Sequence, residues 1–317
     1  MSAKLGVVIP SFRAEATIAD VLRAIPANVA HVLVVDDASP DRTAQLAEAV
    51  ADPRVRVIRH EKNRGVGGAM KAGYLAALQA GCDVIVKMDA DGQMDAAHLA
   101  ELVRPLVRGE AGYAKGNRLT SLDASRAMPR RRLLGNLFLS MATKAVSGYW
   151  NLLDPTNGYT AIRADVLCRL DFAQLEERYF FETSMLVELH LLRVPVRDVL
   201  MPARYHGERS SMRLLPISFE FGARLAAALL RRLWLEYVVF DFRPASAFGA
   251  AGLALSVFGG TFGGYHWYRS IVDQRTASAG TVMVAALPFL LGVRLLLQAV
   301  VLDIGEVRDF SLLPPLE

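Results

Sequence analysis

The feature that most constrains this fold is a regular alternation of short apolar runs and helix-like segments over roughly the first 90 residues. Each apolar run has the length of a strand, and each intervening segment has the length of a short helix. The four runs are Leu5–Ile9, His31–Val35, Val55–Arg59 and Cys82–Met88. This spacing predicts an α/β domain with a mostly parallel sheet and helices on both faces.

Two of these runs end in paired carboxylates. Asp36 and Asp37 follow the second run, and Asp89 and Asp91 follow the fourth. Residues i and i+2 of an extended chain point to the same side, so Asp89 and Asp91 can converge on one point. Hard oxygen donors of this kind suit Mg²⁺ or Mn²⁺ held together with a phosphorylated substrate. The alternative is a polar turn with solvated carboxylates, but ligands of parallel sheets bind at this edge, which favours one shared site.

Two charge-poor stretches lie near the C-terminal end. Ala245–Tyr268 contains no Lys, Arg, Asp or Glu, and Ala277–Leu302 contains only Arg294. Each exceeds the roughly 20 residues that cross a hydrocarbon core, and membrane helices tolerate Pro288 and the glycines. We therefore expect a transmembrane helical hairpin; the alternative is a pair of buried helices in a soluble α domain.

The expected orientation places the N-terminal domain in the cytosol. The first apolar run is too short for a signal peptide and is stopped by Pro10. Arg231, Arg232 and Arg243 flank the first span on the same side, as the positive-inside rule requires, although Arg269 and Arg275 in the outer loop weaken the bias. We divide the chain into a cytosolic domain (1–212), an amphipathic interfacial region (213–243), two transmembrane helices (244–303) and a cytosolic tail (304–317).

Several function classes are excluded. Two cysteines indicate a reduced compartment and provide no zinc site, and a scattered net charge of +4 does not indicate nucleic-acid binding. A nicotinamide dehydrogenase needs a glycine-rich turn after the first strand. Pro10-Ser11-Phe12-Arg13 occupies that turn here. The glycines of Gly65–Gly68 follow the third strand instead, where we expect Asn63–Gly68 to form a turn.

A set of motifs in a fixed order resembles the family 2 glycosyltransferases with the GT-A fold. The motifs are Val8–Phe12, Val34–Thr43, Asn63–Gly65, Met88–Gln93, Gly116–Arg118, Met128–Arg132, Asp154–Tyr159 and Tyr179–Glu182. With two terminal membrane helices added, the chain most resembles the polyprenyl-phosphate glycosyltransferases, which are similar to dolichyl-phosphate mannosyltransferase. The resemblance implies a Rossmann-like GT-A domain at the membrane, which in a bacterium is the inner membrane.

The resemblance also implies a donor site for a nucleotide-diphosphate sugar. Asp36 and Asp37 would accept hydrogen bonds from the base and ribose, while Asp89, Asp91 and Gln93 would hold Mg²⁺ or Mn²⁺ on the diphosphate. The alternative role of Asp36 and Asp37 is to anchor the N-terminus of the next helix. The remaining residues assigned to the nucleotide are Pro10, Phe12, Gly65, Lys71 and Ala90. Lys71 would contact the phosphates, with a surface lysine on a helix as the alternative.

The same resemblance places the acceptor opposite the donor. Arg118 and Arg131 would bind the phosphate of a polyprenyl phosphate, with Arg130 and Arg132 attracting anionic lipid. The phosphate oxygen is already ionised, so inverting transfer needs no strong base. Asp154 and Glu182 would bind sugar hydroxyls, or Asp154 would orient the acceptor, unless the two residues only cap a turn and a helix.

Departures from the family pattern qualify this assignment. The Asn-Glu expected after Phe12 is replaced by Arg13 and Ala14, and the Gln-x-x-Arg-Trp motif of processive synthases is missing, so we expect transfer of one sugar.

Two further apolar segments have sparse charges at helical spacing, namely Leu133–Trp150 and Leu214–Phe242. We expect them to lie at the bilayer interface, with core helices as the alternative.

Two other functions stay open. The acceptor could be a hydroxyl of a glycolipid or glycan, in which case Asp154 or Glu182 would serve as general base. A non-catalytic subunit that binds nucleotide sugar would keep the fold without turnover. In either case a membrane hairpin offers contacts with lipid and a surface for a homo-oligomer.

Overall fold

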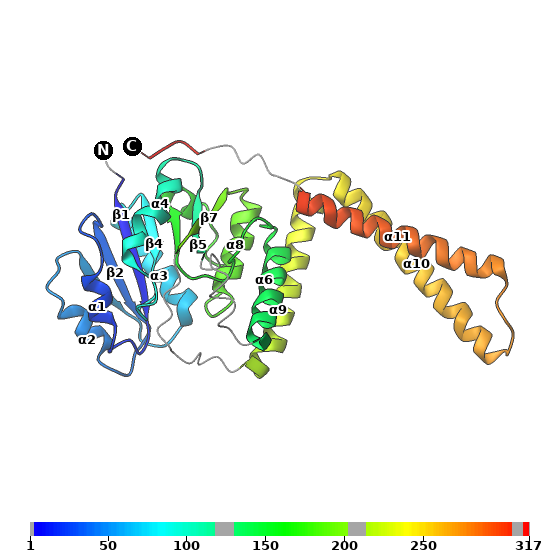
Figure 1. The fold of residues 1–317 in the computed structure, drawn as a ribbon, viewed down its shortest axis with the longest axis horizontal. Helices are drawn as coiled ribbons and strands as arrows, with labels where there is room; N and C mark the ends of the chain where they lie inside the picture. Colours follow the sequence, from blue (N-terminus) through cyan, green and yellow to red (C-terminus); the bar gives the residue numbers. More distant parts are fainter. Residues whose placement is uncertain (1–2, 118–129, 202–213, 306–312, 317) are drawn as a thin grey trace. The chain divides into compact units, whose positions relative to one another are not determined.

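The computed structural model describes residues 3–117, 130–201, 214–305 and 313–316. It divides into two compact units, which we call the sheet unit (Met1–Leu229 with Asp309–Glu317) and the hairpin unit (Leu230–Arg308). Figure 1 shows the elements of each unit.

The sheet unit contains one seven-stranded sheet in the order β3-β2-β1-β4-β6-β5-β7. Its strands are β1 (Leu5–Ser11), β2 (His31–Asp36), β3 (Val55–Arg59), β4 (Val84–Lys87), β5 (Tyr113–Asn117), β6 (Thr160–Arg163) and β7 (Val196–Leu200). Strands β1 to β4 are parallel, whereas β6 runs antiparallel to both β4 and β5. The prediction of a mostly parallel sheet is confirmed.

Helices cover both faces of this sheet, because successive side chains of each strand point to opposite sides. Val7 and Ile9 pack with α1 (Ile18–Arg23), α2 (Thr43–Glu48) and α4 (Leu99–Val107). Val8 packs on the other face with α3 (Gly65–Gln79), α7 (Ala164–Leu167) and α8 (Phe181–Leu191). A short 3₁₀ helix, Ala96–His98, leads into α4, and α6 (Arg130–Ser147) and α9 (Leu214–Trp234) follow further along the chain.

One local prediction is wrong. We expected a turn over Asn63–Gly68, but Gly65–Gly68 form the first turn of α3. The carboxylate of Asp37 accepts hydrogen bonds from the backbone N–H groups of Arg64 (2.9 Å) and Gly65 (2.7 Å), which caps the helix. Gly67 is required because a side chain there would collide with the carbonyl oxygen of Glu176.

The C-terminal residues 313–316 pack on the sheet unit. The N–H of Leu313 donates to the carbonyl oxygen of Gly109 at 3.0 Å. The buried guanidinium of Arg163, at the end of β6, donates to the carbonyl oxygen of Pro314 at 2.7 Å. The chain therefore returns to the sheet unit after the last long helix.

The hairpin unit contains α10 (Pro244–Val272) and α11 (Ala279–Gly305), both long and apolar enough to cross a membrane. Small residues bring their backbones close together. A side chain at Gly259 would lie 2.6 Å from the carbonyl oxygen of Ala285, and one at Gly292 would lie 2.5 Å from the backbone nitrogen of Ser256. These contacts fix the pairing of the two helices.

A buried ion network ties the base of the hairpin together. Arg232 is 1% exposed and donates to both carboxylate oxygens of Asp303, at 2.9 and 3.1 Å. It also contacts Glu236 at 3.1 Å, in the π-helical segment Leu235–Phe240, and the Tyr237 hydroxyl donates to Asp303. Opposite charges with several hydrogen bonds compensate for this burial.

Candidate active site

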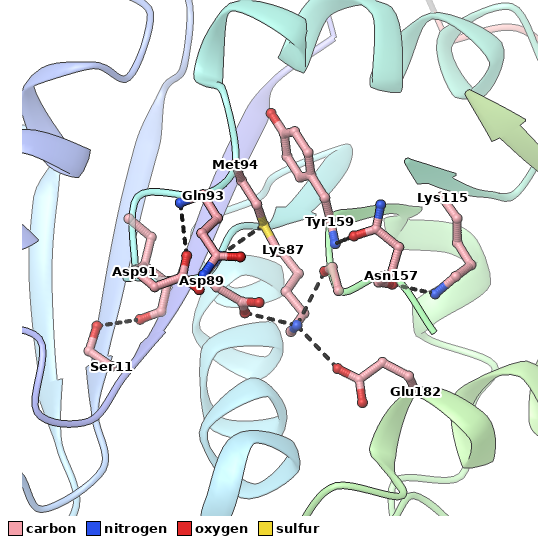
Figure 2. Close-up of polar contacts among 12 residues, drawn as sticks. Ser11, Lys87, Asp89, Asp91, Gln93, Met94, Lys115, Asn157, Tyr159 and Glu182 are labelled. Carbon is pink, nitrogen blue, oxygen red and sulfur yellow. Dashed lines mark hydrogen bonds and ion pairs between the residues drawn. The ribbon is translucent and has the colours of Figure 1, made fainter. Parts of the chain in front are cut away.

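The paired carboxylates lie where β4 ends, at the carboxyl edge of the parallel strands (Figure 2). Asp89 is partly buried and Asp91 is exposed, and the turn between them and α4 contains Gly92 in the left-handed region at φ 75°. The turn is held by hydrogen bonds from the N–H of Gln93 to Asp91 (3.0 Å) and from the N–H of Asp89 to the sulfur of Met94 (3.2 Å).

This donor set fits a divalent cation that a phosphorylated ligand helps to bind. No group of three His, Cys, Asp or Glu side chains that could hold a metal occurs among the described residues. Mg²⁺ commonly uses only one or two carboxylates and takes its remaining oxygens from water and substrate phosphates. Asp89 and Asp91 with the amide of Gln93 match that chemistry.

A buried ammonium group lies directly behind the carboxylates. Lys87 is 2% exposed, and its Nζ contacts Asp89 Oδ1 at 2.9 Å and Glu182 Oε1 at 3.2 Å. It also donates to the carbonyl oxygen of Gly158 at 3.2 Å. Burial opposes the charge on Lys87, but Asp89 and Glu182 outweigh burial and raise its pKa. Lys87 is therefore an ammonium ion balanced by two carboxylates.

The sequence interpretation missed Lys87. A signal was present, because Lys87 stands two residues before Asp89 and alternation sends both to the same side. Glu182, which was assigned, begins α8 and is brought to this point from 95 positions away. The ammonium group of Lys87 thus links Asp89 to Glu182.

The two aspartates after β2 have different surroundings. Asp37 contacts Nδ1 of His60 at 2.8 Å and caps α3, so its oxygens serve the fold in this structure. Asp36 is 5% exposed; its Oδ2 accepts a 3.4 Å hydrogen bond from the N–H of Ser39, while its Oδ1 is buried without a hydrogen-bond partner. A buried carboxylate oxygen with no partner is costly, and a bound hydroxyl or N–H would relieve that cost.

The ends of β1 and β2 carry backbone strain. Arg13 and Ala38 adopt the left-handed region at φ 55° and 58°. This backbone conformation costs free energy for any residue that has a side chain. The Arg13 guanidinium lies 5.3 Å from the ring centroid of Phe12, which is 46% exposed. Pro10 is half-buried in the same strand end. This edge presents an aromatic face and a cation together.

Other assigned nucleotide residues lie nearby. Gly65 starts α3 beside Asp37, and the carbonyl oxygen of Ala90 accepts a 2.6 Å hydrogen bond from the hydroxyl of Thr17. Lys71 is half-buried on α3, and the structure does not bring it to Asp89. It lies near Glu177, whose pKa is lowered mainly by a hydrogen bond from Arg64 and less by the charge of Lys71.

A second buried lysine supports the loop before β6. Lys115 on β5 is fully buried and donates to the carbonyl oxygen of Asn157 at 2.6 Å. Burial lowers the pKa of Lys115 to about 8, although Glu182 and Asp154 oppose that shift. Asp154 is 4% exposed and opens the turn that leads to Asn157, whose N–H donates to the carbonyl oxygen of Asp154 at 3.3 Å. The sequence did not identify Lys115 or Asn157 as parts of this site.

The acceptor arginines fall partly outside the described residues. Arg118 lies in the segment 118–129, and Arg130, Arg131 and Arg132 begin α6 with side chains outside the description. Further along α6, Leu137, Phe138 and Met141 are 59%, 75% and 51% exposed. An apolar patch of this kind is unusual on a surface that faces only water.

Known proteins resemble the chain in both sequence and fold. It is 27% identical over 212 residues to UDP-N-acetylglucosamine–dolichyl-phosphate N-acetylglucosaminyltransferase of Methanococcus voltae, covering 61% of this chain and 84% of that protein. It is 37% identical over 157 residues to undecaprenyl-phosphate mannosyltransferase of Micrococcus luteus, covering 49% of this chain and 63% of that protein.

Among solved structures, glucosyl-3-phosphoglycerate synthase from Mycobacterium tuberculosis, in complex with Mn²⁺, UDP and glucosyl-3-phosphoglycerate, superposes with a TM-score of 0.53. The two are 21% identical, and the match covers 73% of this chain and 80% of that chain, so the likeness concerns the fold. The sequence profile described as "Glycosyl transferase family 2" matches residues 6–170, slightly more than half of the chain. The chain therefore belongs to glycosyl transferase family 2.

Proposed function

We propose that this protein is a membrane-anchored inverting glycosyltransferase that moves one sugar from a nucleotide diphosphate to polyprenyl phosphate. The observation that carries the proposal is the acidic pair Asp89 and Asp91 at the carboxyl edge of β4, in a family 2 chain with two apolar helices. Relatives named for transfer to dolichyl phosphate and undecaprenyl phosphate support this class of acceptor.

On the donor side, Asp89, Asp91 and Gln93 would hold Mg²⁺ or Mn²⁺, which neutralises charge that develops on the leaving diphosphate. The complex of the mycobacterial synthase with Mn²⁺ and UDP supports such a cation. Asp36 is suited to the nucleoside because its buried Oδ1 has no hydrogen-bond partner in the protein. Phe12 offers an exposed ring on which a base can stack.

On the acceptor side, Arg118 and Arg131 would bind the lipid phosphate through paired N–H groups. The phosphate oxygen is itself the nucleophile, so the protein has to position it in line with the sugar and supply compensating charge. Asp154 and Glu182 would then contact sugar hydroxyls or orient the acceptor. Glu182 already shares the ammonium of Lys87 with Asp89.

The proposed location is a membrane crossed twice, with the sheet unit in the cytosol. The exposed apolar side chains of α10 and α11 support lipid contact. Residues 313–316 also bind the sheet unit, which supports a hairpin whose two ends are on the same side of the membrane. The exposed residues of α6 support contact of the sheet unit with the lipid interface.

The test uses full-length protein in detergent with undecaprenyl phosphate and a panel of nucleotide sugars, and detects the lipid product by mass spectrometry. Asp91→Ala should abolish the product. Asp83→Asn, at the opposite end of β4, should keep it. Equal activity of Asp91→Ala and wild type would refute the metal assignment.

The acceptor role is tested separately with Arg131→Ala. This change should raise the KM for lipid phosphate and leave the KM for the donor unchanged, because only the acceptor loses its charge partner. Unchanged acceptor kinetics would remove Arg131 from the site. Transfer to a sugar hydroxyl with no transfer to lipid phosphate would favour a glycolipid or glycan acceptor, and binding of the nucleotide without turnover would indicate a non-catalytic subunit.

A further inference from the structure

The ammonium group of Lys87 has no N–H group left for a substrate. An ammonium carries three donors. All three acceptors within reach belong to the protein, namely Asp89 Oδ1, Glu182 Oε1 and the carbonyl oxygen of Gly158. With a 2% exposed side chain, Lys87 acts only through the groups that it holds (Figure 2).

The ammonium of Lys87 and the carboxylate of Asp89 lie close against the backbone of Gly158. A Cβ atom at Gly158 would lie 2.6 Å from Nζ of Lys87 and 2.9 Å from Oδ2 of Asp89. Real Cβ contacts are essentially never shorter than 3.0 Å, so residue 158 cannot carry a side chain unless this pair moves. The side chains of Lys87 and Asp89 therefore occupy the space that a side chain at residue 158 would need.

This arrangement places a positive charge against the first carboxylate of the metal pair before any cation arrives. A divalent ion that approaches Asp89 also approaches the ammonium, and like charges in a partly buried site repel more strongly than in water. The diphosphate of a donor brings negative charge that compensates for this repulsion. A cation should thus bind weakly to the protein alone and more strongly together with a nucleoside diphosphate.

We propose that Lys87 is a positioning residue that makes binding of the divalent cation depend on the nucleotide diphosphate. The proposal rests on the proposed function, because it takes Asp89 and Asp91 as the cation ligands. The consequence is an order of binding. The divalent cation that activates the leaving group enters the site with the donor and is not bound there between turnovers.

Glu182 provides a second test, in which the expected change in cation affinity has the opposite sign. It shares the ammonium with Asp89, so its charge reduces the net positive charge that an incoming cation meets. Removing the charge of Glu182 leaves the ammonium to Asp89 alone and should weaken cation binding. Removing the charge of Lys87 should strengthen it.

The experiment measures Mn²⁺ binding to full-length protein in detergent by electron paramagnetic resonance, without nucleotide and with UDP or GDP. Lys87→Met, which keeps the length of the buried stem, should lower the nucleotide-free Kd about tenfold and reduce the gain on adding nucleotide. Glu182→Gln should raise the nucleotide-free Kd. Lys4→Met removes an exposed charge just before β1, at the sheet edge opposite Asp89. It should change neither the nucleotide-free Kd nor the Kd with nucleotide.

Circular dichroism shows whether each variant is folded. If Lys87→Met does not fold, Glu182→Gln still tests the proposal. Nucleotide-free Kd values for both variants that equal that of wild type would overturn the proposal, even where wild type transfers sugar to lipid phosphate. Failure of the proposed function gives other results: if only the acceptor assignment fails, wild type still binds Mn²⁺ with nucleotide but forms no lipid product, and if the metal assignment fails, wild type binds no Mn²⁺ with any nucleotide. That outcome also overturns the role of Lys87.

Discussion

Lys115 makes the stability of the sheet unit depend on pH in a direction unusual for a lysine. Its side chain is completely buried on β5, where the ammonium donates one short hydrogen bond to the carbonyl oxygen of Asn157. Burial lowers its pKa from 10.5 to about 8, against the attraction of Glu182 and Asp154. In the unfolded chain the pKa returns to the ordinary value of about 10.4.

The sign follows from proton binding. Between pH 8 and 10.5 the unfolded chain holds a proton on Lys115 that the folded protein has released, so the free energy of unfolding rises with pH through this window. Each pKa unit corresponds to about 1.4 kcal/mol, which gives a rise of about 3 kcal/mol. Below pH 8 the folded state carries the full cost of a buried ammonium.

The measurement compares wild type with Lys115→Met in urea unfolding followed by circular dichroism at pH 7, 8, 9 and 10, on full-length protein in detergent. Lost packing and the unpaired carbonyl of Asn157 add a term that does not vary with pH. The stability of wild type relative to Lys115→Met should therefore increase by about 3 kcal/mol as the pH rises through the window. Lys4→Met, a change at an exposed lysine, serves as the matched control. A flat difference for Lys115→Met would refute the reasoning, and a falling one would mean that the carboxylates outweigh burial.

Two further predictions use matched glycines. Gly109 and Gly81 both adopt the left-handed region, at φ 74° and 72°, but only a side chain at Gly109 would collide with the carbonyl oxygen of Leu313. Gly109→Ala should accelerate hydrogen exchange of the Leu313 amide, and Gly81→Ala should not, although both lose about 1–2 kcal/mol of stability from backbone strain. In the hairpin, Gly259→Ala should lower the thermal midpoint in detergent by forcing α10 from α11, at a cost of about 1–3 kcal/mol. Gly264→Ala is the control, because a Cβ there meets nothing within 4 Å; equal midpoints would contradict the close packing.

Much of the fold could be predicted because its signals are local. Apolar runs of strand length, separated by helix-length segments, determine a parallel sheet with two covered faces, and charge-poor stretches identify α10 and α11. The start of α3 could not be predicted in this way, because the group that caps it, Asp37, lies 28 positions before Gly65. Glycines that favour a turn by themselves become helical once a distant carboxylate accepts their N–H groups.

The residues of the site also divide into those with a local sequence signal and those that depend on distant parts of the chain. Asp89 and Asp91 could be proposed as site residues because two carboxylates directly after an apolar run are a signal local in the sequence, and the structure places both just beyond β4, which ends at Lys87. The link between Asp89 and Glu182 depends on tertiary packing, since α8 must be placed against β4 before Lys87 can reach both. Lys115 was missed for a related reason: a lysine in a strand reads as exposed until both faces of that strand are known to be covered.

The antiparallel strand β6 explains how the loop before it reaches the sheet edge where Asp89 and Asp91 lie. In an all-parallel sheet, the residues that precede a strand lie at the edge opposite the carboxyl ends. Because β6 runs against β4, with Lys87 opposite Thr160, the residues before β6 lie beside the carboxyl end of β4. The same reversal puts Gly158 against Lys87 and sends Arg163, at the other end of the strand, to the edge where residues 313–316 bind. One reversed strand thus places Gly158 beside Lys87 and Asp89 and places Arg163 where residues 313–316 pack.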